Sequence, residues 1–132
     1  MDNGPLVREE IEAGEELARA FHLYQPLKAA FWLRAGDEEQ RYLYLASDGI
    51  DDTNFDIAYG EILRLVRKID SPDLDPFRVR VIGGDNALAI DAAEINTRYP
   101  DRVPRRSGSQ MFGGLYVEDL YIYPPLPEMA RA

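Results

Sequence analysis

Acidic side chains gather in one short stretch of this chain, from Asp48 to Asp56. Grouped carboxylates are ligands that Mg²⁺ and Mn²⁺ accept, and these ions support phosphoryl transfer. Asp48, Asp51 and Asp52 are therefore candidate metal ligands, although their spacing does not match an EF-hand loop. Each acid also has a structural use, because Asp48 suits a turn with the glycine that follows it and the others suit the start of a helix. We prefer this structural interpretation of the stretch.

Two glycines and an aspartate, Gly83, Gly84 and Asp85, form a second candidate site between a predicted strand and a predicted helix. Glycines in this position can let a phosphate approach free backbone amides. Neither the dinucleotide-binding fingerprint nor the Walker lysine is present, and Asp85 would repel an anion. We interpret the glycines as turn residues and Asp85 as the N-cap of the helix.

Four arginines, Arg98, Arg102, Arg105 and Arg106, make a third candidate site. They lie in the segment 98–114, which has no periodicity and predicts a long loop rich in arginine, proline and glycine. Residues 98–110 carry a net charge of +3, although the whole chain carries −9. Arginine forms bidentate contacts with phosphate and carboxylate, so these residues are candidates for binding a partner or a phosphate. Pairing with the protein's own acidic helix is the alternative use.

That acidic helix is predicted from about residue 5 to about residue 21, where apolar residues return to one side of a helical pattern. Its other side carries several glutamates, among them Glu9, Glu12 and Glu16. A solvated outer face explains them, and imitation of nucleic-acid charge by an inhibitor is the alternative. Gly14 is expected to weaken the helix by about 1 kcal/mol relative to alanine.

The elements that position these residues are best defined between Arg41 and Ile82. A strand at 41–47 is followed by a helix that starts near Thr53, the predicted cap, with Asp56 three residues later. Its apolar face continues to residue 69, and the alternating run 77–82 predicts a second strand. This is a βαβ unit.

Three further elements complete the expected fold. Residues 27–34 predict a strand that forms a hairpin with 41–47, residues 87–98 predict a helix, and residues 115–123 predict a last strand. The resulting order is α-β-β-α-β-α-β in one domain spanning 1–132. We therefore expect an α/β fold, with α+β as the alternative, built on a mixed four-stranded sheet.

Right-handed crossovers would make the last three strands parallel and place the loops. The acidic stretch and the glycine loop then follow the carboxyl ends of parallel strands, the edge where open α/β sheets bind ligands. We expect the hairpin turn and the arginine loop at the opposite edge.

Composition restricts the classes of function. The chain has 132 residues, 45% hydrophobic and 30% charged, with no cysteine and one histidine, His22, which we place at a helix end. Disulfides, thiolate catalysis and cysteine-ligated metals are excluded. The first 61 residues hold 14 acids and 5 bases, and the remainder holds 10 of each. General nucleic-acid binding is therefore disfavoured, and we expect a cytoplasmic protein without membrane segments.

These observations predict a small soluble binding module without catalysis, and no cofactor. Its expected partner is another protein or a second copy of the chain. A metal-dependent phosphoryl-transfer or nucleic-acid-processing enzyme, with Mg²⁺ or Mn²⁺ on Asp48, Asp51 and Asp52, is the alternative. An acidic inhibitor that imitates nucleic acid is the third possibility.

Overall fold

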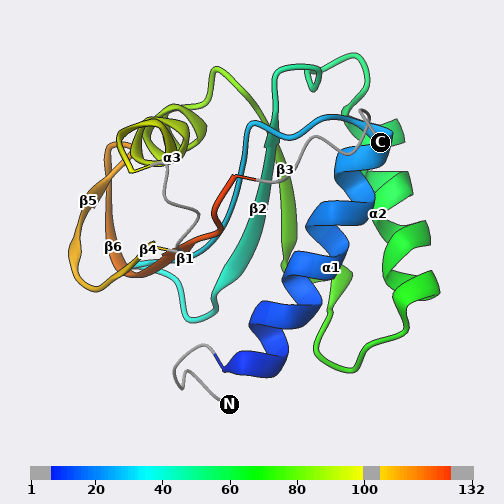
Figure 1. Cartoon of the computed structure of the whole chain (residues 1–132), viewed down its shortest axis with the longest axis horizontal. Helices are drawn as coiled ribbons and strands as arrows, with labels where there is room; N and C mark the ends of the chain where they lie inside the picture. Colours follow the sequence, from blue (N-terminus) through cyan, green and yellow to red (C-terminus); the bar gives the residue numbers. More distant parts are fainter. Residues whose placement is uncertain (1–6, 100–104, 126–132) are drawn as a thin grey trace.

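The computed structural model describes residues 7–99 and 105–125, which form three helices, a short 3₁₀ turn and six strands in one sheet (Figure 1). The helices are α1 (Arg8–Tyr24), α2 (Phe55–Ile69) and α3 (Ala87–Arg98), and the 3₁₀ turn is η1 (Pro76–Arg78). The strands are β1 (Ala29–Ala35), β2 (Tyr42–Ser47), β3 (Val79–Gly83), β4 (Arg105–Ser107), β5 (Gln110–Phe112) and β6 (Leu115–Ile122). The predicted mixed α/β fold is confirmed.

The sheet runs in the order β3-β2-β1-β6-β4, and β5 also pairs with β6. β2 and β3 are parallel and joined by α2, as the βαβ prediction requires. β1 forms the predicted antiparallel hairpin with β2 and pairs antiparallel with β6 on its other side. β6 therefore runs in the same direction as β2 and β3, as predicted, although it is not their neighbour.

The sheet has six strands instead of the predicted four, because β4 and β5 lie within the segment 98–114 that was expected to be a loop. Each has three residues, too few to show a period of two. Gly113 and Gly114 turn the chain from β5 into β6 with φ of 57° and 82°. Positive φ at both central residues is typical of a type I′ hairpin turn, so this glycine pair was a strand signal that the sequence interpretation missed.

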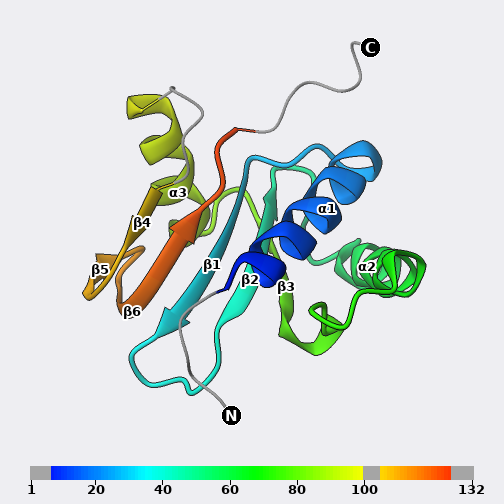
Figure 2. The same cartoon turned by 60° about the horizontal axis from the view of Figure 1, so that its bottom comes forward.

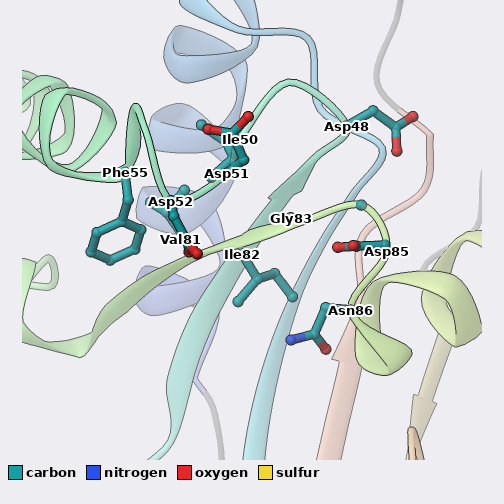
Figure 3. Close-up of a pocket in the computed structure, with 11 residues that line it drawn as sticks. Asp48, Ile50, Asp51, Asp52, Phe55, Val81, Ile82, Gly83, Asp85 and Asn86 are labelled. Carbon is teal, nitrogen blue, oxygen red and sulfur yellow. The ribbon is translucent and has the colours of Figure 1, made fainter.

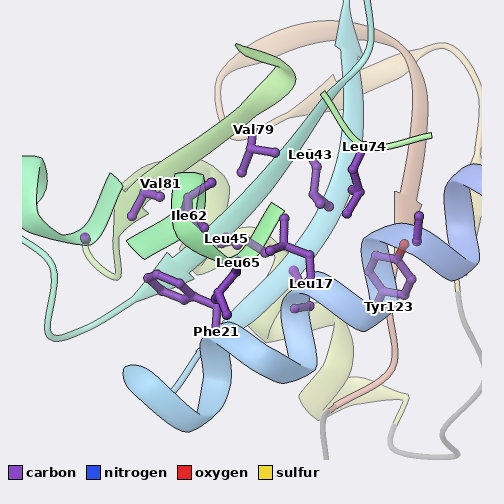
Figure 4. Close-up of a cluster of buried hydrophobic side chains, with 14 of the residues drawn as sticks. Leu17, Phe21, Leu43, Leu45, Ile62, Leu65, Leu74, Val79, Val81 and Tyr123 are labelled. Carbon is purple, nitrogen blue, oxygen red and sulfur yellow. The ribbon is translucent and has the colours of Figure 1, made fainter. Parts of the chain in front are cut away.

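Helices cover both faces of the sheet, with α1 and α2 on one side and α3 on the other (Figure 2). The first core lies between the sheet and α1 and α2, where Leu17 and Phe21 meet Leu43 and Leu45 (Figure 4). The second core joins α3 to the other face and includes Phe31. Because successive strand residues point to opposite faces, β1 and β2 are apolar almost throughout, as strands covered on both sides must be.

A buried hydrogen-bond chain fixes α1 on the sheet. The indole Nε1 of Trp32 donates to the Tyr123 hydroxyl at 2.9 Å, and that hydroxyl donates to the carbonyl of Ile11 at 2.6 Å. Gly14 sits directly over the two rings, since a Cβ there would lie 2.5 Å from the Tyr123 hydroxyl oxygen. α1 therefore continues through Gly14, which permits the close approach of helix and sheet.

None of the described helices is both long and apolar enough to cross a membrane.

Candidate functional site

The loops that follow β2 and β3 meet at one edge of the sheet, as predicted, and enclose a hollow of about 540 Å³ (Figure 3). Four carboxylates line it, and we call it the acidic hollow. Those carboxylates belong to Asp48, Asp51, Asp52 and Asp85. None of the described residues that line it is basic, and the ring of Phe55 supplies an apolar side.

Asp51 holds the first of these loops in shape. Its carboxylate accepts hydrogen bonds from the backbone N–H of Thr53 at 2.8 Å and from the Thr53 hydroxyl at 2.5 Å. These bonds lower the pKa of the Asp51 carboxyl, and the bond from the Thr53 hydroxyl has the largest effect. The Asn54 side chain accepts from Asp51 N–H and donates to the carbonyl of Gly49. The predicted cap is wrong: the hydroxyl of Thr53 is a donor to Asp51, and Asn54 stands at the N-cap of α2 without a side-chain capping bond.

Asp48 faces the base of the second loop. Its carboxylate lies 3.6 Å from Nζ of Lys28, which also donates to the carbonyl of Gly84 at 3.1 Å. A Cβ at Gly84 would lie 3.1 Å from the Asp48 Cα, and 1.8 Å from its Oδ1. Gly84 therefore lets the two loops pack side by side, with Lys28 bridging them.

The metal interpretation gains no geometric support. Within residues 7–99 and 105–125, no group of three histidine, aspartate or glutamate side chains is placed to hold a metal ion. The candidate ligands Asp48 and Asp51 have the protein partners described above. Mg²⁺ or Mn²⁺ would thus have to compete with Lys28 and Thr53 for these carboxylates.

Asp52 and Asp85 differ from the other two acids of the hollow. Both are exposed, and in the described part of the chain neither side chain has a hydrogen bond or ion pair. Asp85 was predicted to cap α3, but Asn86 does so by accepting from Leu88 N–H at 2.9 Å. The hollow is therefore lined by two carboxylates that the fold does not use.

The acidic hollow opens at the edge of the sheet rather than over one face. Val81 packs toward α2 and Ile82 points to the opposite face, yet both line the hollow. Successive side chains of a strand point to opposite faces, so a hollow that touches both reaches around the outer edge of the strand or around its carboxyl end. β3 is an outer strand of the sheet, so this edge faces away from β2. Two exposed aromatic side chains belong to neighbouring segments: Phe55, which lines the hollow and is 42% exposed, and Phe77, which precedes β3 and is 79% exposed.

The four arginines of the third candidate site are only partly described. Arg98 ends α3 and lies 3.5 Å from the carboxylate of Glu94, an exposed pair that contributes little stability. Arg102 lies outside the described residues. Arg105 and Arg106 belong to β4, and their partner-binding role stays a prediction.

These arginines were expected toward the edge of the sheet that holds the hairpin turn. Arg105 pairs with Ile122, Ile122 with Phe31, and Phe31 with Tyr44, so β4 begins level with the first half of β2, the half that adjoins the hairpin turn. β4 runs antiparallel to β6. β4 and β3 are still the two outer strands, so the sheet separates Arg105 from the acidic hollow.

Two buried or half-buried arginines, Arg41 and Arg80, have structural roles that sequence reasoning missed. Arg41 is 6% exposed and its Nε donates to Asp119 at 3.1 Å. Arg80 stacks 3.6 Å from the centre of the Tyr42 ring and donates to the Tyr44 hydroxyl at 2.7 Å. The guanidinium of Arg80 thus covers the ring of Tyr42. The only indication in the sequence was the alternation of arginine and valine in 77–82, and it concerns Arg80 alone.

The acidic face of α1 is partly neutralised by its own neighbours. Three of its glutamates pair with arginines. These pairs are Glu10 with Arg41 at 3.9 Å, Glu12 with Arg8 at 3.8 Å and Glu15 with Arg19 at 2.8 Å. Glu9 and Glu16 are exposed and have no described hydrogen bond or ion pair in residues 7–99 and 105–125. The hypothesis that α1 imitates the charge of a nucleic acid therefore has less support than the glutamates in its sequence indicated.

His22 is at the end of α1, where its Nδ1 accepts a hydrogen bond from Leu27 N–H at 2.9 Å.

No protein-family model, curated protein or solved structure matches this chain.

Proposed function

We propose that this chain is a non-catalytic module that binds a protein partner carrying basic side chains at the acidic hollow. The observation that carries the proposal is the placement of Asp52 and Asp85. Two exposed carboxylates without described partners in residues 7–99 and 105–125 line one hollow, beside an exposed aromatic ring. Lysine or arginine side chains of a partner would supply the missing opposite charge.

The surroundings of the hollow fit a protein better than a small ion. Phe55 lines it and Phe77 lies just before β3, and aromatic residues are enriched in protein interfaces. The chain's net charge of −9 would steer a basic partner toward it and slow the approach of nucleic acid. Action in the cytoplasm is part of the same proposal.

The two alternatives have weaker support. A metal-dependent enzyme needs a converging ligand set, and Asp51 instead accepts two hydrogen bonds from Thr53. An inhibitor that imitates nucleic acid needs an uninterrupted line of acids, and α1 pairs three of its glutamates with arginines.

Two variants test the proposal with matched charge. The hollow variant carries Asp52→Asn and Asp85→Asn, and the helix variant carries Glu9→Gln and Glu16→Gln. Each variant removes two exposed carboxylates that have no described partner within residues 7–99 and 105–125. The two variants therefore change the net charge equally. Both should melt within a few degrees of the wild type, because exposed substitutions away from such contacts change stability by about 0.5 kcal/mol or less.

The experiment compares proteins retained from a lysate of the native source by the immobilised wild type and both variants at physiological salt. A partner of the hollow is retained by the wild type and the helix variant, and its amount falls about tenfold or more on the hollow variant. A tenfold loss corresponds to about 1.4 kcal/mol, within the range of hydrogen bonds to charged groups. Equal retention by both variants would contradict the proposal, and selective loss on the helix variant would favour the inhibitor hypothesis.

A further inference from the structure

Much of one row of backbone hydrogen-bonding groups on β3 is unused. Among the described residues β3 is an outer strand and pairs with β2 alone, from Val79 opposite Leu43 to Gly83 opposite Ser47. In the same part of the chain the amide of Val79 donates to the carbonyl of Pro76, whereas the amides and carbonyls of 80–82 have no backbone hydrogen bond beyond the β2–β3 ladder. Such an edge is a template for another strand.

This edge lacks most of the devices that usually block strand addition. Residues Val79–Gly83 include no proline and no lysine, and the pairing of β3 with β2 continues without a bulge. Of these devices β3 has two, because it spans only five residues and carries the charged side chain of Arg80. The strand is preceded by Phe77, whose side chain is 79% exposed. An incoming segment would thus meet apolar surface at one end of the edge.

The acidic hollow lies at the carboxyl end of this same strand. Val81 and Ile82 line it from opposite faces of β3, and the carboxylates of Asp52 and Asp85 stand at the end of the strand. An extended segment lying along β3 would therefore run from Phe77 toward the two acids. Backbone pairing supplies affinity in this mode of recognition, and the side chains that meet the acids supply specificity.

Charge decides between the possible occupants. A second copy of the chain would bring its own Asp52 and Asp85 against this edge, and each copy carries a net charge of −9. Like charges placed opposite each other in an interface disfavour association. A segment with lysine or arginine side chains is complementary to the four acids of the hollow.

We propose that the partner presents an extended basic segment, which adds to the free edge of β3 as a new strand and places its cationic side chains against Asp52 and Asp85. This inference rests on the proposed function, because it names the form of the partner that the acidic hollow binds. It predicts that recognition depends on the partner's backbone as well as its charge.

The probe is a fluorescent eight-residue peptide of alternating lysine and valine, acetylated and amidated at its ends. Two modified peptides carry methyl groups on backbone nitrogens. In one peptide every lysine is methylated at its backbone nitrogen, and in the other every valine is. A bound strand directs alternate N–H groups to its neighbour and the others away from it. Charge and length are the same in all three peptides, and the protein is unchanged, so no variant has to fold for this comparison.

Fluorescence anisotropy at physiological salt measures the affinity of each peptide for the wild type, the hollow variant and the helix variant. Strand addition predicts that one N-methylated peptide binds at least about tenfold more weakly than the unmodified peptide, whereas the other stays within about threefold. The unmodified peptide should bind the hollow variant at least about tenfold more weakly than the helix variant.

Equal affinity of the two N-methylated peptides would overturn strand addition. If the hollow variant alone still lost affinity in that case, charge recognition at the acidic hollow would stand by itself. No measurable binding of the unmodified peptide would also overturn strand addition, while the lysate experiment would still decide the proposed function. Sedimentation showing a wild-type dimer that the peptide dissociates would assign the edge to a second copy and contradict the basic occupant.

Discussion

Replacing Tyr123 by phenylalanine removes one oxygen atom from the contact that fixes α1 on the sheet. That oxygen accepts from Trp32 Nε1 at 2.9 Å and donates to the carbonyl of Ile11 at 2.6 Å. Both rings are 3% exposed, so water cannot easily replace the lost partner. The variant leaves a buried indole N–H without its acceptor.

The expected cost follows from that unsatisfied donor. A buried polar group without a partner costs about 1 to 3 kcal/mol, and the lost bond to the Ile11 carbonyl acts in the same direction. We therefore expect the free energy of unfolding to fall by about 2 kcal/mol. For a chain of 132 residues this corresponds to a melting temperature lower by roughly 5 to 10 °C.

Urea unfolding followed by circular dichroism, with a parallel thermal scan, measures this difference. Tyr116→Phe is the matched control, because Tyr116 lies in β6, is 49% exposed and has a hydroxyl without a described hydrogen bond in residues 7–99 and 105–125. The control should stay within about 0.5 kcal/mol of the wild type. Equal stability of the Tyr123 variant and the control would refute the assigned role of the buried hydroxyl.

Three further outcomes follow from the same core. Gly14→Ala should lower the free energy of unfolding by about 1 to 3 kcal/mol in urea titrations, since its Cβ would lie 2.5 Å from the Tyr123 oxygen and 2.9 Å from Trp32 Nε1; a neutral result would contradict the close packing. Arg41→Met should cost about 3 kcal/mol in the same assay, because Asp119 would lose its buried partner, and wild-type stability would show that the pair is dispensable. Burial raises the pKa of Tyr123 above its ordinary value of about 10, so the folded protein keeps this proton when the unfolded chain loses it. The contribution of this hydroxyl to the free energy of unfolding is complete below about pH 10 and is lost as the pH rises further. Unfolding free energies measured from about pH 8 to 11 should therefore fall less steeply in Tyr123→Phe than in the wild type.

Long periodic segments made much of the fold predictable. The apolar face of α2 and the two strands beside it are each long enough to show their period, so the βαβ unit was clear. The position of the acidic loop at a sheet edge followed from that unit, because a loop after a parallel strand must lie at its carboxyl end. The structure confirms this placement.

Pairings between distant segments were not predictable. β6 lies beside β1, which follows from packing over the whole fold and leaves no mark in either strand. β4 and β5 are each three residues long, so the glycine turn at Gly113 was their only strong signal. As a result, Arg105 and Arg106 were assigned to a loop, although they belong to β4.

The candidate site shows why residue type alone is not enough. Asp51 and Asp52 are adjacent and chemically identical, yet Asp51 accepts two hydrogen bonds from Thr53 and Asp52 has none in the described part of the chain. Likewise, Asp85 and Asn86 both suit an N-cap, and the exact start of α3 selects Asn86. Which carboxylate remains available for a partner depends on differences of one residue, below the accuracy with which sequence patterns place helix ends.

Nuclear magnetic resonance would test the central claim most directly, by titrating the ¹⁵N-labelled protein with the alternating lysine–valine peptide and following every backbone amide. Binding at the acidic hollow and the β3 edge should shift the resonances of residues 79–86 and 48–55 and slow hydrogen exchange at alternate amides of β3. The amides of Glu9 to Glu16 on α1 should not change. Shifts concentrated on α1, or spread evenly over the acidic half of the chain, would contradict the account.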